Sequence, residues 1–454
     1  MELGKEYAVF ENRRLCPYFC QVMDMMESIW RKDGALPRFP KLEEEQKTDV
    51  LIVGGGMAGL LCARLLTDSG VDCTLIEADR ICGGVTGNTT AKITAQHGLI
   101  YSRLYREFGP ERTKLYWQAN DMAARTLADM AEGCDLERKA HYVYATRCLS
   151  AVEDEWDVLD ELGIPAEYAG CTELPVQILG AIRFPKQAQF HPLKFAGKIA
   201  RGLRIFENTK ALEFAQGRVR TESGWIRAEK IIVATHFPVL NKHGGYFLKL
   251  YQDRSYVLGL EGVKPLEGMY LAAEKDGLSF RSYGSCLLLG SRGHRTGTAS
   301  RGWQELERFA NEHYHGKPAS FRWAAQDCMT LDGIPYIGQY ASRTPNLYVA
   351  TGFNKWGMTG SMVAASLLRD QILGRENPFG AVFSPVRSSF RPQLAVNALE
   401  SARNILTLRT PRCPHLGCAL KWNPQERSWD CPCHGSRFSE EGKRLNGPST
   451  GDLK

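Results

Sequence analysis

The sequence predicts an α/β fold that is followed by a small all-β module at the C-terminal end. The apolar run 49–53 leads into a glycine-rich turn and then a helix, an order that is typical of nucleotide-binding α/β units. Cysteine and histidine residues gather near the end of the chain, between residues 413 and 434. At 454 residues the chain is too long for one ordinary core, so two or more domains are expected.

The composition argues against several classes of protein. Hydrophobic residues make up 43% of the chain and charged residues 24%, which is ordinary for a globular protein. The net charge of +6 is small and the basic residues are scattered, so no nucleic-acid partner is expected. No stretch is apolar over the length of a membrane helix, and the N-terminus has no apolar signal segment. We therefore expect a cytoplasmic protein whose cysteines outside the C-terminal group, including Cys16 and Cys20, are free thiols.

Residues 1–47 are expected to form an N-terminal arm. A short helix is predicted at 20–31, followed by an extended run. Pro37 and Pro40 stop any helix in that run, because proline cannot continue one.

The glycine-rich turn has the form of a dinucleotide fingerprint. The sequence GGGMAG at 54–59 opens a helix through residue 66, and a second strand, 73–76, ends at Glu77. The glycines allow a tight turn close to a pyrophosphate, the helix N-terminus offers free N–H groups, and Glu77 is placed to hold the adenosine ribose. The expected dinucleotide contacts here are Gly54, Gly56, Met57, Ala58, Gly59, Glu77 and Ala78.

FAD is favoured over NAD because the fingerprint begins the fold and no second such unit follows. The segment 83–92 is rich in small and hydroxyl residues, which suits a loop along a ribityl chain. A buried strand at 230–235 is typical of FAD-binding folds, in which it accompanies the fingerprint strand. The glycine-rich loop 351–360 opens a helix whose N–H groups can face the flavin. The further expected FAD contacts are Thr86, Thr89, Thr90, Ala91, Lys92, Ala211, Ala234, Thr235, Gly352, Trp356, Gly357, Met358 and Thr359.

Near the C-terminus, a Cys-x-His pair precedes a Cys-x-x-His pair. Together they offer two thiolates and two imidazoles, which suit a two-iron cluster with a different ligand pair on each iron. The same residue types could hold a structural zinc ion. Zinc would not explain why Cys418 and Cys433 occupy matched places in the two segments.

The segment 412–438 resembles the Rieske [2Fe–2S] signature in its disulfide-containing form. The resemblance implies that Ser436 hydrogen-bonds a cluster sulfur. Respiratory-type Rieske proteins have a tyrosine where this chain has Phe438, so we expect a lower reduction potential. The implied cluster ligands are Cys413, His415, Cys431 and His434, and the implied disulfide joins Cys418 and Cys433.

Residues 48–375 resemble the D-amino-acid oxidase/glycine oxidase superfamily, through GGGMAG with Glu77, IIVAT, LDGIPYIG and ATGFNKWGMTG. The segment 83–98 and the Rieske signature together resemble the bacterial flavin–Rieske fusion group. This implies an FAD-binding Rossmann-like fold of the glutathione-reductase type, with an inserted α+β substrate domain. The implied division is an oxidoreductase domain at 48–380, with its FAD part at roughly 48–110, 180–240 and 325–380 and its substrate part at roughly 110–180 and 240–325.

Residues 381–454 are expected to be a linker and a shortened Rieske module. A complete Rieske fold has several strands ahead of the first Cys-x-His pair, whereas 378–412 is not strand-like and 397–406 favours a helix. We therefore expect the module to lean on the flavin domain, on a partner subunit or on the arm.

The resemblance implies hydride transfer from a carbon bearing an amine to flavin N5, so no catalytic triad is expected. Arg281 could clamp a substrate carboxylate or be structural. Lys355 could stabilise reduced flavin near N1 or be a solvated lysine. Other residues with a functional and a structural interpretation are His97, His191, Tyr256 and Tyr283, while His313 and His315 are expected at a solvated helix end.

A flavin takes two electrons at once, whereas the cluster carries one. The pairing suggests a dehydrogenase that oxidises an amine or amino acid and passes electrons to an external acceptor, a protein among the possibilities. Two alternatives stay open: an electron-transfer reductase that serves a partner enzyme, and a redox sensor.

Overall fold

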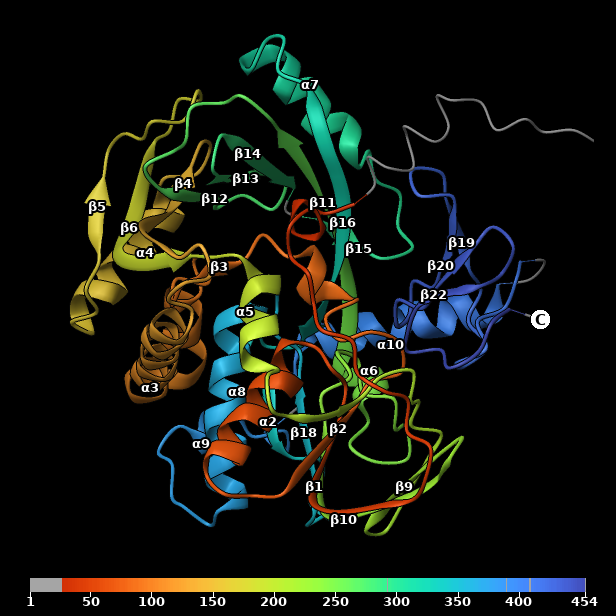
Figure 1. Cartoon of the computed structure of the whole chain (residues 1–454). Coiled ribbons are helices and arrows are strands. Elements are labelled where there is room, and N and C mark those ends of the chain that lie inside the picture. Colours follow the sequence, from red (N-terminus) through yellow and green to blue (C-terminus); the bar gives the residue numbers. More distant parts are fainter. Residues whose placement is uncertain (1–26, 292, 389, 408–409, 454) are drawn as a thin grey trace, which may run out of the picture.

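A computed structural model describes residues 27–291, 293–388, 390–407 and 410–453. These residues build three sheets of eight, ten and four strands (Figure 1). The helix expected at 20–31 falls partly outside the described residues, and Ile29–Arg31 form a short 3-10 helix, η1. Among the described residues, no helix is long and apolar enough to cross a membrane.

The eight-stranded sheet contains the predicted nucleotide-binding unit. Strand β1 pairs in parallel with β10 on one side and β2 on the other, and its last four residues are buried. The strands are β1 (Gln46–Val53), β2 (Cys73–Ile76), β7 (Arg204–Phe206), β8 (Glu213–Ala215), β9 (Arg218–Thr221), β10 (Gly224–Val233), β17 (Tyr336–Gln339) and β18 (Leu347–Thr351). This arrangement confirms the predicted α/β fold class.

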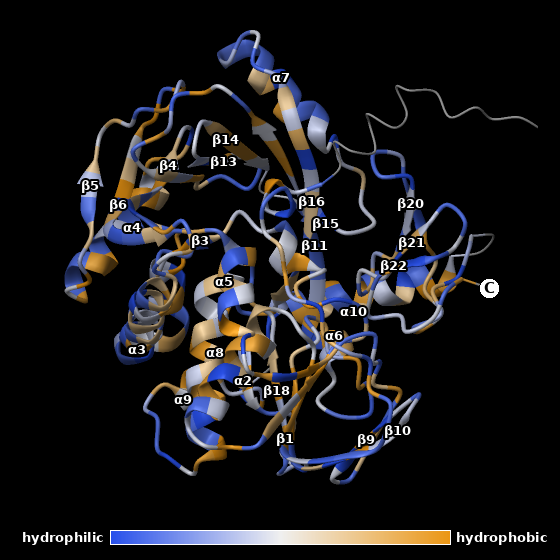
Figure 2. Ribbon diagram, viewed as in Figure 1, coloured by the Kyte–Doolittle hydropathy of each residue, from blue (hydrophilic) through white to orange (hydrophobic). Residues whose placement is uncertain are grey.

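Helices α2 (Met57–Asp68) and α8 (Gly357–Ile372) pack against each other beside this sheet. Figure 2 shows hydrophobic residues concentrated on β1 and on these helices, which belong to the largest core cluster. The other helices of this part are η2 (Val85–Asn88), α3 (Tyr101–Met130), α5 (Pro192–Ile199) and α9 (Gly380–Phe383). Helix α3 is kinked where Gly109, at φ 79°, precedes Pro110.

The ten-stranded sheet is mixed and lies above the first part in Figure 1. Its longest pairing joins β11 and β16, which run antiparallel from Leu250 opposite Thr330 to Leu260 opposite Ala319. The strands are β3 (Lys92–Ile93), β4 (Glu137–Ala145), β5 (Glu167–Ala169), β6 (Gly180–Gln189), β11 (Leu250–Leu260), β12 (Met269–Ala272), β13 (Leu278–Tyr283), β14 (Cys286–Ser291), β15 (His294–Arg295) and β16 (Ala319–Thr330). The helices that accompany this sheet are α4 (Ser150–Glu161), α6 (Tyr246–Lys249) and α7 (Trp303–His313).

The C-terminal module is a four-stranded antiparallel sheet with one helix, which confirms the predicted small all-β module. The helix, α10 (Pro392–Leu406), is longer than the segment 397–406 that favours a helix in the sequence. The strands are β19 (Lys421–Asn423), β20 (Ser428–Asp430), β21 (Arg437–Ser439) and β22 (Arg444–Asn446). In Figure 1 this module lies beside β11 and β16, on the side away from α3.

Candidate functional site

The fingerprint turn requires its glycines. Gly54 has φ 113°, and a Cβ there would lie 2.5 Å from the Ala234 carbonyl oxygen. A Cβ on Gly59 would lie 1.9 Å from the Gly54 oxygen, so only glycine lets α2 start this close to β1. The Met57 N–H donates to Thr86 Oγ1 at 3.1 Å, which brings the predicted loop to the N-terminus of α2.

Glu77 follows β2 and turns back to the same place. Its Oε2 accepts from the Gly55 N–H at 2.7 Å and its Oε1 from the Asp79 N–H at 3.0 Å. Burial raises the pKa of Glu77, against the effect of these backbone donors. The predicted ribose-binding carboxylate therefore lies at the glycine turn.

A second buried carboxylate was not found by sequence reasoning. Glu207, just after β7, accepts from the Phe39 N–H and the Ile81 N–H and pairs with Arg80. It ties the extended N-terminal run to the turn that follows Glu77. No local pattern marks it, because its partners lie more than 120 residues away.

The loop at 83–92 is anchored from several elements. Trp30 Nε1 donates to the Thr89 oxygen at 2.7 Å and Trp323 Nε1 to the Asn88 oxygen at 2.9 Å. Arg281 is fully buried and donates to the Ala91 oxygen at 2.8 Å, to Thr90 and to Phe190. Its guanidinium is thus committed to main-chain carbonyls, which supports the structural interpretation and argues against the predicted carboxylate clamp.

Lys92 continues this loop into the ten-stranded sheet. Its Nζ donates to the Tyr270 oxygen at 2.8 Å and to Ser279 Oγ at 2.9 Å. Burial, and then the nearby Arg281 charge, lower the pKa of Lys92 to about 7.

The two histidines with open roles have complete sets of partners. His97 hydrogen-bonds Tyr116 through Nδ1 and Thr94 through Nε2, and its ring stacks on Trp356 at 4.8 Å. His191 Nδ1 caps α5 by accepting from the Lys194 N–H. Both arrangements support the structural interpretation.

The loop before α8 is sharply bent. Asn354 and Lys355 both have positive φ, at 50° and 74°, and Asn354 Oδ1 accepts from the Thr330 N–H at 2.8 Å. Thr359 Oγ1 donates to the Thr94 oxygen, so the N-terminus of α8 meets the end of the 83–98 segment. The first N–H groups of α8 have no partner within the helix and can serve a ligand.

Lys355 contacts strand β11 and is not a solvated lysine. Its Nζ donates to Ser255 Oγ at 2.8 Å and lies 3.4 Å from Asp253 Oδ2. Asp253 lies directly opposite Asp327 on β16. Burial raises the pKa of Asp327 to about 6, while the Lys355 charge opposes that rise.

The two cysteine–histidine segments fold into matching loops. In the first, the Cys413 N–H donates to the Cys418 oxygen and the Gly417 N–H to the Cys413 oxygen, both at 2.9 Å. In the second, the Cys431 N–H donates to the Ser436 oxygen at 2.8 Å and the Gly435 N–H to the Cys431 oxygen at 2.9 Å. The same two bonds therefore shape both loops.

These loops bring the predicted ligands together. The rings of His415 and His434 are 5.0 Å apart, and the thiols of Cys413 and Cys431 are within hydrogen-bonding reach. The Ser436 hydroxyl lies at the Cys413 thiol and accepts from the Ser449 N–H at 2.9 Å, which leaves its proton for sulfur.

The histidine nitrogens provide a test of the cluster assignment. Nδ1 of both His415 and His434 is buried with no hydrogen-bond partner among the described residues. His434 Nε2 is 2.9 Å from the Phe247 oxygen, and His415 Nε2 contacts the Asn241 side chain. Burial lowers the pKa of both rings to about 4, so both imidazoles are neutral. Nδ1 of each ring therefore has an unused lone pair, which a metal ligand requires.

The predicted disulfide is not present. Cys418 and Cys433 are free thiols, and their sulfurs form a group with Cys431 in which all three lie within 4.8 Å of one another. Cys418 thus lies near two sulfurs and is bonded to neither. The matched positions of Cys418 and Cys433 along the chain do not reveal this packing of three sulfurs.

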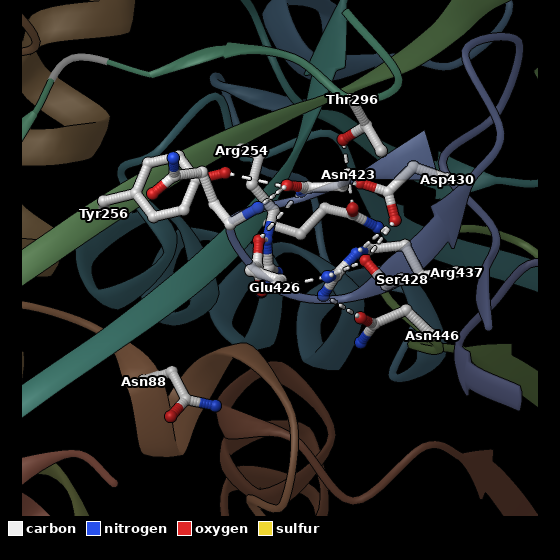
Figure 3. A network of polar contacts seen from close by, with 12 residues as sticks. Asn88, Arg254, Tyr256, Thr296, Asn423, Glu426, Ser428, Asp430, Arg437 and Asn446 are labelled. Carbon is white, nitrogen blue, oxygen red and sulfur yellow. Dashed lines mark hydrogen bonds and ion pairs between the residues drawn. The ribbon is translucent and has the colours of Figure 1, made fainter. Parts of the chain in front are cut away.

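The module and the ten-stranded sheet share a buried ionic network (Figure 3). Arg254 Nε on β11 donates to Glu426 Oε1 at 2.7 Å, and Arg437 lies 2.9 Å from both Glu426 and Asp430. Although burial alone would raise it, the two arginines lower the pKa of Glu426 to about 2. Arg254 and Glu426 are 172 residues apart, so no sequence pattern joins them.

Further contacts run from the sheet to the second cluster loop. Gln252 Nε2 donates to the His434 oxygen at 3.2 Å and Gln326 Nε2 to the Gly435 oxygen at 2.8 Å. Arg295 Nε donates to the Pro432 oxygen at 3.0 Å and its Nη1 to Asn397 Oδ1 at 2.9 Å. The shortened module therefore leans on the flavin-type part, one of the three supports expected from the sequence.

Comparisons with known proteins agree with both the nucleotide-binding turn and the cluster loops. The model of the FAD dependent oxidoreductase family matches residues 49–371, and that of the Rieske [2Fe-2S] domain matches residues 394–454. The chain is 32% identical to the Bacillus subtilis protein YhfW, described as a Rieske 2Fe-2S iron–sulfur protein, over 94% of this chain and 97% of that one.

Solved structures share the fold of the larger part. Glycine oxidase from Geobacillus kaustophilus is 21% identical with a TM-score of 0.63, covering 76% of this chain and 99% of the other. L-proline dehydrogenase from P. horikoshii is 15% identical with a TM-score of 0.64, covering 76% and 98%. One family model matches the larger part of the chain, a second matches its C-terminal part, and one relative matches almost the whole length. This chain therefore belongs to the FAD-dependent oxidoreductases of the D-amino-acid oxidase type and ends in a Rieske [2Fe–2S] domain.

Proposed function

We propose that this oxidoreductase is a dehydrogenase that oxidises a carbon–nitrogen bond of an amine or amino acid. Electrons would pass from reduced flavin through the Rieske cluster to an external acceptor. The observation that carries the proposal is the position of the cluster loops, which contact the β11–β16 pair directly.

This strand pair presents different residues on its two faces, because successive side chains of a strand point to opposite sides. Gln252, Arg254 and Gln326 contact the cluster module. Asp253 and Ser255, at the alternating positions, contact Lys355 in the loop before α8. One pair of strands thus separates the proposed flavin loop from the cluster loops, which favours internal electron transfer.

For FAD itself we propose the contacts that the sequence predicts. The N-terminus of α2 would hold the pyrophosphate, Glu77 the adenosine ribose, and the N-terminus of α8 the flavin ring. When bound, FAD supplies a hydride acceptor. Lys355, already placed by Asp253 and Ser255, would keep a positive charge close to that ring.

The substrate class rests on similarity of fold together with this arrangement. The solved neighbours include a glycine oxidase, an L-proline dehydrogenase and an L-amino acid deaminase, all of which act on amino acids. We propose a small amine or amino acid here as well. We also propose the division into an arm at 1–47, an oxidoreductase domain at 48–380 and a Rieske module at 381–454, and a cytoplasmic location.

Anaerobic EPR spectroscopy of the purified protein tests this proposal. Spectra are recorded as isolated, after dithionite, and after each of a panel of amines and amino acids. A Rieske-type signal with dithionite and also with one donor is the expected result. A signal with dithionite alone, together with flavin bleaching by NADH, would instead establish the electron-transfer reductase.

The variant Cys431→Ser is the control, because it removes one proposed cluster ligand and leaves the flavin part unchanged. With the correct donor its flavin should bleach while no Rieske signal appears. If the variant keeps the signal, the ligand assignment is wrong.

A further inference from the structure

Helix α10 has its polar side buried and its apolar side exposed, the reverse of the usual order. Asn397 is buried and bonds Arg295 and the Leu248 oxygen, and Asn404 is buried and bonds Glu400. Leu399 and Leu406 are 70% and 77% exposed. We call the exposed side the α10 patch, and its members are Val396, Leu399, Ile405 and Leu406, with Leu416 nearby on the first cluster loop.

The α10 patch is joined to the cluster loops. Arg412 Nη1 donates to the oxygens of Ile405 and Gly417, and the Ala419 N–H donates to the Asn404 oxygen at 2.9 Å. The C-terminal end of the helix and the loop that carries Cys413 therefore form one unit. Soluble proteins rarely expose clusters of apolar side chains, and such clusters usually mark an interaction site.

The histidine edge of the cluster site faces the oxidoreductase part of the chain. The Nε2 atoms of His415 and His434 face Asn241 and the Phe247 oxygen. Leu416, which follows His415 on the first cluster loop, is exposed beside the α10 patch. The exposed part of the first cluster loop therefore adjoins the α10 patch.

The charge around the α10 patch indicates the kind of partner. Arg403 and Arg412 are exposed, and neither forms an ion pair with any described residue. The described residues between 392 and 412 include two arginines, one glutamate and no aspartate or lysine. A twofold dimer through this patch would place identical positive charges face to face, so charge complementarity favours an acidic partner over a second copy.

We propose that the α10 patch docks an acidic one-electron carrier protein with an apolar contact face. This inference rests on the proposed function, since it supplies the outlet for the electrons. In each encounter one electron would leave the reduced protein and reduce the carrier, with no bond or proton change.

The test begins from protein reduced with dithionite, so it does not depend on the substrate. Stopped-flow mixing with an acidic ferric c-type cytochrome follows haem reduction, and a basic c-type cytochrome and ferricyanide serve as comparison oxidants. Leu399→Glu should slow reduction of the acidic cytochrome by about tenfold and leave the ferricyanide rate unchanged. Calorimetric titration of the oxidised protein with the acidic cytochrome should show the same loss of binding.

Met122→Glu is the matched control, because Met122 is 52% exposed and its helix, α3, lies on the side of the molecule away from α10 in Figure 1. It should react as the unaltered protein does, and Leu406→Glu should repeat the Leu399→Glu result. The proposal is overturned if Leu399→Glu reduces the acidic cytochrome at the unaltered rate. It is also overturned if light scattering shows a dimer that Leu399→Glu dissociates, since a second copy would then occupy the patch. A failure of the substrate-driven EPR experiment would refute the dehydrogenase and leave these results unaffected.

Discussion

Replacing Glu426 with glutamine tests how strongly the Rieske module is held. Glu426 pairs with Arg254 across the interface and with Arg437 inside the module, and its side chain is 9% exposed. Lowering its pKa from the ordinary 4.5 to about 2 corresponds to roughly 3 kcal/mol at 1.36 kcal/mol per pKa unit. Removing one member of a buried ion pair costs about 3–5 kcal/mol, which agrees with that value.

The same contribution depends on pH in a defined direction. The folded-state pKa of Glu426 is lowered, so its stabilisation is present above about pH 4.5 and is lost as the pH falls from there through about 2. The glutamine variant has no such carboxyl group. Its free energy of unfolding should therefore differ from that of the unaltered protein most at neutral pH and least near pH 2.

Urea unfolding measures the stability of both parts. The visible circular dichroism of the cluster follows unfolding of the module, and flavin fluorescence follows unfolding of the larger part. Glu440→Gln is the control, because Glu440 pairs with Arg427 at the surface and such pairs contribute less than about 1 kcal/mol. Glu426→Gln should shift the cluster transition far more than Glu440→Gln does. Equal, small shifts in the two variants would refute the reasoning.

Three further predictions concern two buried cations, Arg281 and Lys92, and the partly buried Arg295. Arg281→Met should weaken FAD binding by at least about tenfold, because the carbonyls of residues 90 and 91 lose their donor. The FAD retained after dialysis measures this effect. Unchanged FAD binding with a raised KM for a carboxylate substrate would instead favour Arg281 as a clamp for the substrate carboxylate. Arg295→Gln should lower the reduction potential of the cluster in an EPR-monitored titration, since a positive charge beside the second loop is lost, and Arg295→Lys should keep more of it. Relative to Lys92→Met, the unaltered protein should gain thermal stability as the pH rises from 7 to 10.5, because Lys92 binds a proton in the unfolded chain but not in the folded one over that range. Equal pH profiles for the two proteins would count against the lowered pKa.

The nucleotide unit and the cluster loops could be predicted from the sequence because their geometry is local. Gly54 and Gly59 are required by contacts within one strand–turn–helix unit, and Glu77 returns to that turn. Each cluster loop is shaped by two hydrogen bonds that span five residues or fewer. Spacing along the chain therefore carries the information.

The rest depends on contacts between distant segments. The strand position of Arg281 does not reveal that its donors meet carbonyls of residues 90, 91 and 190. Arg254 and Glu426 look like ordinary surface charges until β11 and the module meet. Matched cysteines suggested a bond between Cys418 and Cys433, whereas packing in three dimensions adds Cys431 to the same group.

The alternation of side chains along β11 has a consequence for how such a fusion can change over time. Inserting or deleting a single residue within the strand would exchange the two faces on one side of the change, because side chains alternate with a period of two. Arg254 would then point toward Lys355, and Asp253 would point toward the module and meet Asp430 and Glu426. One such event would disrupt the contacts of both redox parts at once. A change of length between residues 252 and 255 therefore costs more than a single substitution, since it breaks contacts of both redox parts.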